Sequence, residues 1–217
     1  MDICKVKSKV LYWSVINHKL VEPTAIDTWI DLYSFLDIFP WYKIFKLAHC
    51  IVPETYLHTF QYKILHRLLN CNYNLNKWKL KDNPNCLYCK RVDTIEHHLF
   101  DCELNLAFWD RVKTWLAETL GICNEQKYSV CEILFGYNIQ ENGYSEDSHV
   151  QNIIILLGKL FINKTRVAEK TVNVTEFLRY FRPKLELYYS SFNLSDSAGV
   201  AKQSQIAGKI KRILDKI

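Results

Sequence analysis

The part of the sequence whose residue types could carry chemistry runs from Cys86 to Cys102 and reads CLYCKRVDTIEHHLFDC. Two residues separate Cys86 from Cys89, seven more lead to His97, and a further four lead to Cys102. Two thiolates at this spacing can reach one Zn²⁺ from a single turn, and three cysteines with one histidine fill all four tetrahedral positions. We therefore expect one structural Zn²⁺ here, because no position is left for a reactive water.

The histidine of this group is ambiguous, because His97 and His98 are adjacent. On one unbroken α-helix from Thr94 to Cys102, His98 would share a face with Cys102, whereas His97 would diverge from it by about 140°. A frayed or 3₁₀ helix end would bring His97 back toward Cys102. Helical geometry alone thus favours His98 and leaves His97 open.

The other cysteines have no ligand spacing, although the chain contains 8 cysteines in all. The N-terminal residues MDICKVKSKV lack a secretory apolar core, and the longest apolar run, residues 153–157, is too short to span a bilayer. We therefore expect an intracellular chain, in nucleus and cytoplasm, with no membrane partner and with reduced thiols. Most cysteines outside the group are then predicted to be buried as small apolar side chains.

The composition of the 217 residues favours helices, because 49% are hydrophobic and only 6 Gly and 5 Pro interrupt them. So few breakers argue against a β-sandwich, whose many turns need both residue types. The predicted fold class is mainly α, with helical bundle subdomains around a small Cys3His zinc knuckle. Apolar periodicity predicts helices near residues 25–36, 41–47, 56–69, 103–120, 150–169, 175–190 and 195–216.

The polar run NIQENGYSEDS at residues 138–148 is the best candidate for a linker. It would separate a helical region at residues 1–137, with the zinc turn at 84–102, from a C-terminal helical subdomain at 149–217 that ends in a basic tail. Residues 70–84 are predicted to be a connector, because they are polar, Asn-rich and basic.

Basic and aromatic residues gather near the cysteines, in a chain with a formal net charge of +5. Cations neutralise phosphates, and aromatic rings stack on unpaired bases without demanding a sequence. An ordinary solvated surface with a buried Trp78 is the competing interpretation. The candidate nucleic-acid-binding residues are Lys63, His66, Arg67, Tyr73, Lys77, Trp78, Lys79, Lys81, Lys90 and Arg91.

The segment from Phe60 to Trp109 resembles the CCHC zinc-binding region near the C-terminus of LINE-type (non-LTR) retrotransposon reverse transcriptases. The shared elements are FQYKILHR, LNKW, the Cys-x2-Cys pair, DTIEH, LF, the last Cys, and FW. In that family the histidine follows a Thr-x-x motif, so the resemblance selects His97 and keeps His98 as the alternative. Asp93 stands where the family usually has Glu, and His98 stands where it usually has an apolar residue.

The resemblance implies a zinc-stabilised accessory module that binds RNA or single-stranded DNA, either the element's template or its target, beside the rest of the reverse transcriptase polyprotein. The sequence has no Tyr-or-Phe-x-Asp-Asp element, which supplies the metal-binding carboxylates of a polymerase, and no endonuclease-like constellation. We therefore expect no enzyme activity. The alternative is a domesticated helical protein-interaction module whose zinc is purely structural.

Overall fold

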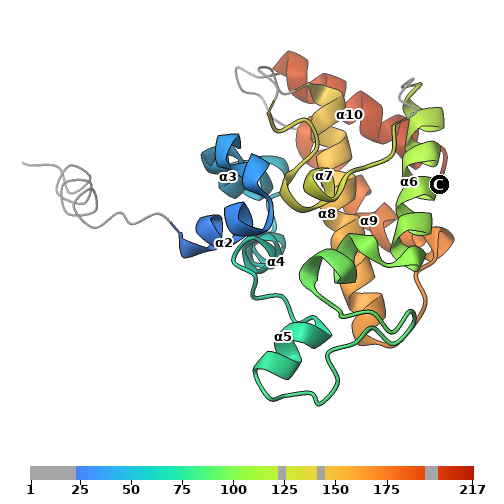
Figure 1. Cartoon of the computed structure of the whole chain (residues 1–217). Coiled ribbons are helices and arrows are strands. Elements are labelled where there is room, and N and C mark those ends of the chain that lie inside the picture. Colours follow the sequence, from blue (N-terminus) through green and yellow to red (C-terminus); the bar gives the residue numbers. More distant parts are fainter. Residues whose placement is uncertain (1–22, 122–125, 141–144, 194–199) are drawn as a thin grey trace, which may run out of the picture. The chain divides into compact units, whose positions relative to one another are not determined.

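The computed structural model describes residues 23–121, 126–140, 145–193 and 200–217 (Figure 1). The described residues are mainly helical and contain no β-strand, which confirms the predicted mainly-α class. The chain divides into two compact units, residues 1–39 and residues 40–217. The predicted linker at 138–148 falls inside the second unit, and residues 141–144 lie outside the described residues.

In the first unit, the helix predicted at 25–36 is present as two shorter elements. Helix α2 spans Thr24–Leu32, and the 3₁₀ helix η2 spans Ser34–Ile38. Tyr33 separates them, because its φ of −141° and ψ of 86° are not helical. Leu32, Phe35 and Ile38 are exposed large apolar side chains of this unit.

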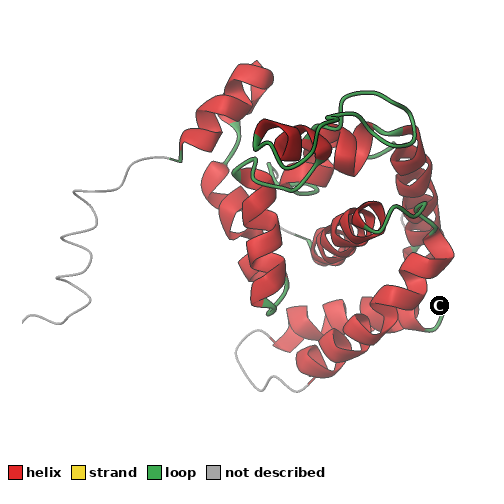
Figure 2. Ribbon diagram, turned by 90° about the horizontal axis from the view of Figure 1, so that it is seen from below, coloured by secondary structure: helices red, strands yellow, loops and turns green. Residues whose placement is uncertain are grey.

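The second unit is organised around α8, which contacts helices on several sides and appears end-on among them in Figure 2. Most residues of α8 are buried, including the polar Lys159 and Arg166. Apolar side chains all round a helix are typical of a helix enclosed by others. The helices of this unit are α3 (Trp41–Ile51), α4 (Thr55–Leu65), α5 (Asn72–Lys77), α6 (Glu103–Leu120), α7 (Val130–Phe135), α8 (Glu146–Val167), α9 (Val174–Asn193) and α10 (Val200–Leu214).

Gly158 allows α8 to lie directly against Trp109 of α6. A methyl group at Gly158 would lie 2.6 Å from the nearest atom of the Trp109 indole. Helix α6 has the predicted bounds, and Gly121 ends it in a left-handed conformation with φ of 69°. Leu104, in the first turn of this helix, is 37% exposed.

Two expectations around residue 70 are wrong. Helix α4 ends at Leu65 and not near residue 69, because Arg67 takes a left-handed backbone conformation with φ of 56°. The predicted connector contains α5, whose buried Asn74 donates to the carbonyl oxygens of Arg67 (2.9 Å) and Leu69 (2.7 Å). These two bonds hold the turn between the helices, a role that polarity alone did not indicate.

Among the described residues, none of the helices combines the length and the hydropathy needed to cross a membrane.

Candidate metal centre

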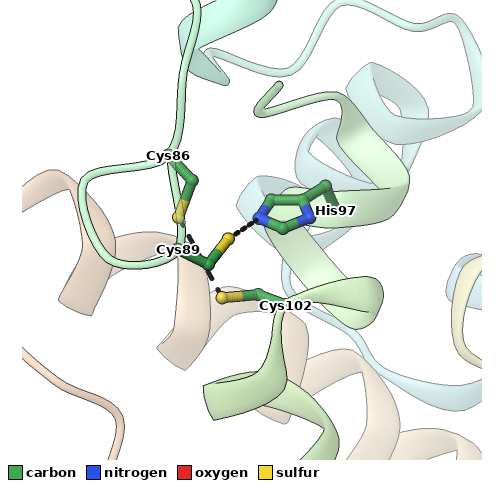
Figure 3. A group of neighbouring side chains, drawn as sticks. All are labelled: Cys86, Cys89, His97 and Cys102. Carbon is green, nitrogen blue, oxygen red and sulfur yellow. Dashed lines mark hydrogen bonds between the residues drawn. The ribbon is translucent and has the colours of Figure 1, made fainter. Parts of the chain in front are cut away.

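The four predicted ligands come together in the second unit (Figure 3). The ligand atoms of Cys86, Cys89, His97 and Cys102 all lie within 4.8 Å of one another. The Sγ atoms of Cys86 and Cys102 are 4.0 Å apart, and Cys89 Sγ lies 3.1 Å from His97 Nε2. We call these four residues the metal centre.

The first two ligands are presented by a tight turn between two short paired arms. The Cys86 N–H donates to the Arg91 carbonyl at 2.7 Å, and the Asp93 N–H donates to the Pro84 carbonyl at 2.9 Å. Lys90 closes the turn with a positive φ of 63°. The arms therefore bring Cys86 and Cys89 to the same side of the turn, with both thiols aimed at His97 and Cys102 (Figure 3).

The other two ligands are held by η3, a π-helical turn that spans His97–Asp101: His97 is its first residue, and Cys102 directly follows its last. A π-helix has a hydrogen bond between residues i and i+5, so residues five apart lie on the same face, whereas in an α-helix they do not. His97 and Cys102 have this spacing. Asn105 and Trp109 of α6 support the turn by donating to its carbonyl oxygens, from Asn105 Nδ2 to His98 (2.9 Å) and from Trp109 Nε1 to Leu99 (2.9 Å).

His98 lies outside the metal centre and is bonded elsewhere. Its Nδ1 lies 3.0 Å from Asp93 Oδ2, and its Nε2 lies 3.1 Å from Asn163 Oδ1 of α8. The helical argument favoured His98 because it assumed a regular α-helix from Thr94 to Cys102. The π-helical turn removes that assumption, and the geometry agrees with the His97 selected by the resemblance.

The donor set fits Zn²⁺. Zinc–sulfur bonds of about 2.3 Å in a tetrahedron place sulfur atoms about 3.8 Å apart, and sulfur and nitrogen about 3.5 Å apart. The 4.0 Å and 3.1 Å separations in the metal centre lie close to these values. With all four positions filled by protein atoms, the ion would stabilise the fold and would not activate a water.

The electrostatics of the metal centre also suit a cation. Burial lowers the pKa of His97, which leaves the ring neutral at neutral pH, as a metal ligand must be. Burial raises the pKa of Cys102. At Cys89 burial also raises the pKa, but hydrogen bonds that include two from Arg91 outweigh it, so the net pKa is lowered. Metal binding would therefore release thiol protons.

Arg166 and Asp93 lie beside the metal centre, and neither contact was predicted from the sequence. Arg166 Nη2 lies 3.1 Å from Cys86 Sγ and 2.7 Å from Asp93 Oδ1. Arg166 follows Cys86 by 80 residues, so no local pattern connects them. The sequence offered one clue to this network: Asp93 stands where the family that the segment resembles usually has Glu.

The predicted nucleic-acid-binding residues divide by exposure. Tyr73, Trp78 and the exposed cations lie at the surface, with Trp78 40% exposed. His66 and Arg67 are half-buried, and Arg67 pairs with Glu96 at 2.5 Å. Lys81, also half-buried, donates to Asn72 Oδ1 at 3.0 Å. The exposed cations are Lys63, Lys77, Lys79, Lys90 and Arg91.

Two of these exposed cations donate to backbone carbonyls beside the metal centre, Lys90 within the cysteine turn and Arg91 to η3. Lys90 Nζ donates to the Leu87 carbonyl at 2.7 Å, and Arg91 Nη2 donates to the Asp101 carbonyl at 3.0 Å. Among the predicted nucleic-acid-binding residues, both exposed aromatic side chains and two further exposed cations therefore lie in residues 72–81, which we call the basic-aromatic segment.

Comparison with known families gives a match over part of the chain. Residues 41–109 match the model of a family described as zinc-binding in reverse transcriptase. The matched range covers about a third of the chain and contains the whole metal centre and the basic-aromatic segment. It ends at Trp109 and leaves out α8, which carries Asn163 and Arg166. Comparisons with curated proteins and with solved structures gave no match.

Proposed function

We propose that this protein is a zinc-stabilised module that binds single-stranded nucleic acid beside a reverse transcriptase of the LINE type (non-LTR). The observation that carries the proposal is the Cys3His metal centre inside a range that matches a reverse-transcriptase zinc-binding family. Zn²⁺ held by Cys86, Cys89, His97 and Cys102 would fix the turn and η3 relative to each other. Its role would be structural, because the donor set is closed.

The nucleic-acid part of the proposal is supported by the basic-aromatic segment. It combines the exposed rings of Tyr73 and Trp78 with the exposed ammonium groups of Lys77 and Lys79. Rings stack on bases of any sequence, and ammonium groups neutralise phosphates, so this combination favours single strands over a sequence-specific duplex site. RNA is the first ligand to test, as the template of a reverse transcriptase.

The basic-aromatic segment also borders the surroundings of the metal centre. A cavity of about 130 Å³ is lined by Lys81 from this segment and by His98 and Arg166 from the network beside the metal centre. A strand bound to the segment would therefore lie next to the network beside the metal centre.

The test is a filter-binding titration with single-stranded RNA at several salt concentrations. Wild type is compared with Lys77→Ala plus Lys79→Ala, and the matched control is Lys211→Ala plus Lys216→Ala, which removes two exposed lysines at the other end of the chain. Each phosphate contact with a single strand contributes about 0.7 to the slope of log affinity against log salt. We expect the first pair to reduce the slope by about 1.4 and the control pair to leave it near the wild-type value.

The alternative is a protein-interaction module. Leu32, Phe35 and Ile38 expose large apolar side chains on the first unit, as a docking surface for a partner helix would. Salt-independent capture of a protein partner with no RNA retained would favour this alternative and would overturn the nucleic-acid proposal.

A further inference from the structure

Arg166 is the one basic side chain that contacts both a thiol of the metal centre and a carboxylate beside it, within the part of the chain that the structure describes. It lies in the last turn of α8, with 5% of its side chain exposed. Its Nη2 lies 3.1 Å from Cys86 Sγ and 2.7 Å from Asp93 Oδ1. A guanidinium stays protonated at every physiological pH, so this contact is a charge-assisted one.

A buried metal centre of this kind needs a cation beside it. Zn²⁺ with three thiolates and one neutral imidazole carries a single net negative charge. Burying an unpaired charge is unfavourable by several kcal/mol, so buried charges in proteins are paired. Arg166 also pairs with Asp93, but its positive charge lies 3.1 Å from Cys86 Sγ, and its N–H group draws electron density from that sulfur. Both effects favour the metal-bound thiolate and reduce its reactivity toward electrophiles.

Asp93 holds Arg166 in position. Besides Arg166, its carboxylate accepts a hydrogen bond from the Asn72 N–H at 3.0 Å and contacts His98 Nδ1 at 3.0 Å. His98 in turn contacts Asn163 of α8. Asp93 and His98 are the two positions that depart from the family pattern, and they contact each other. The departures therefore belong to a single network that joins the cysteine turn to α8.

We propose that Arg166 is a positioning residue of the metal centre, and that it tightens metal binding and shields the Cys86 thiolate. The proposal rests on the metal centre of the proposed function, but not on nucleic-acid binding. It has a structural consequence: the metal-holding unit of this protein extends past residue 109 to the end of α8 at Val167.

The test uses the full chain loaded with one equivalent of zinc, as wild type, Arg166→Met, Arg166→Lys and the control Arg179→Met. Arg179 is an exposed arginine of α9, so the same substitution there changes the same charge away from the metal centre. Zinc affinity is measured by competition with a chromogenic chelator. Thiolate reactivity is measured as the rate of zinc release during alkylation with N-ethylmaleimide. Cobalt-loaded samples report the sulfur-to-cobalt charge-transfer band.

We expect Arg166→Met to weaken zinc affinity about 10- to 100-fold, the range typical for loss of a residue that supports metal ligands. Zinc release on alkylation should be several-fold faster, and the charge-transfer band should move to longer wavelength because the sulfur loses its hydrogen-bond donor. Arg166→Lys keeps the charge and should give intermediate values. Arg179→Met should match wild type.

Unchanged zinc affinity, release rate and cobalt spectrum in Arg166→Met would overturn the proposal, even if the melting temperature fell. If Arg166→Met does not fold, Arg166→Lys supplies the same three readouts, and wild-type values for all three would overturn it equally. A wild-type protein that binds no zinc would overturn the metal centre itself and this proposal with it. Loss of RNA binding alone would overturn only the proposed function.

Discussion

The network around the metal centre and the basic-aromatic segment line the same cavity but use their charged side chains in opposite ways. Arg166 and Asp93 are buried and pair with each other, whereas Lys77 and Lys79 are exposed to solvent. A buried charge must be satisfied inside the protein, whereas an exposed ammonium group can exchange water for a phosphate. A positive side chain is therefore a candidate for phosphate binding only where the fold leaves it exposed to solvent.

The largest expected difference in zinc content and stability is between substitutions at the adjacent residues His97 and His98. We expect His97→Ala to lose stoichiometric zinc, because one of four ligands disappears, and structural zinc contributes roughly 10 to 16 kcal/mol to zinc-finger peptides. His98→Ala should keep one zinc per chain and lose stability only through its bonds to Asp93 and Asn163. Zinc content after gel filtration and thermal melting by circular dichroism test both variants. A zinc-free His98→Ala beside a zinc-loaded His97→Ala would reverse the assignment.

Two tryptophans give the second test, because Trp109 supports the metal centre and Trp78 belongs to the basic-aromatic segment. Trp109 is 1% exposed, contacts Gly158 and bonds the Leu99 carbonyl, so Trp109→Ala should reduce the free energy of unfolding by about 3 to 5 kcal/mol. Trp78→Ala should change it by less than about 0.5 kcal/mol. RNA affinity should instead fall by about 1 to 3 kcal/mol for the lost stacking. Urea unfolding and filter binding separate the two effects, and equal losses of stability would contradict the contrast.

Lys159 tests how much the burial of a charged side chain lowers the stability of the fold. It is fully buried on α8, where its Nζ donates to Gln61 Oε1 at 2.6 Å, and burial lowers its pKa from 10.5 to about 7. Below pH 7 both the folded and the unfolded states hold the proton, so the full penalty of burying the charge is present. Between pH 7 and about 10.5 the folded state has released the proton and the unfolded state has not, so stability rises with pH.

We therefore expect Lys159→Met to raise the free energy of unfolding by about 1 to 4 kcal/mol at pH 6.5, with a gain that shrinks toward pH 10. The measurement is thermal unfolding across this pH range with wild type in parallel. Lys164→Met, which changes an exposed lysine of the same helix, is the control and should stay within about 0.5 kcal/mol at every pH. A gain that does not depend on pH would contradict the burial argument.

The smallest expected changes in stability and in RNA binding come from two neighbouring cations of the predicted nucleic-acid surface, Arg67 and Lys63. Arg67 pairs with the buried Glu96, so Arg67→Ala should lower stability by about 1 to 3 kcal/mol, because a buried carboxylate loses its partner. Lys63 is exposed, so Lys63→Ala should leave stability unchanged and reduce the salt slope of RNA binding by about 0.7 if it contacts a phosphate. Chemical denaturation and salt titrations measure the two quantities. A stable Arg67→Ala variant with a reduced slope would move Arg67 to the binding surface.

Local signals in the sequence predicted several elements well, because their causes are local. The bounds of α6 follow from the helical spacing of its apolar residues and from Gly121 at its end. The break at Arg67 and the short helix α5 were missed, because Asn74 sustains them through carbonyl groups that a pattern of polar and apolar residues does not show. The boundary at residues 138–148 stays a prediction.

What the sequence determined by itself is the donor set: cysteines and a histidine at spacings that suit one tetrahedral ion, in a chain rich enough in apolar residues to fold as helices. The tertiary structure decided which histidine joins them, because η3 depends on support from Asn105 and Trp109. It also decided that Arg166 contacts Cys86 across 80 residues, and that Arg67 is paired while Lys77 is exposed. Spacing is a property of the local chain, whereas burial and charge pairing depend on which helices pack together.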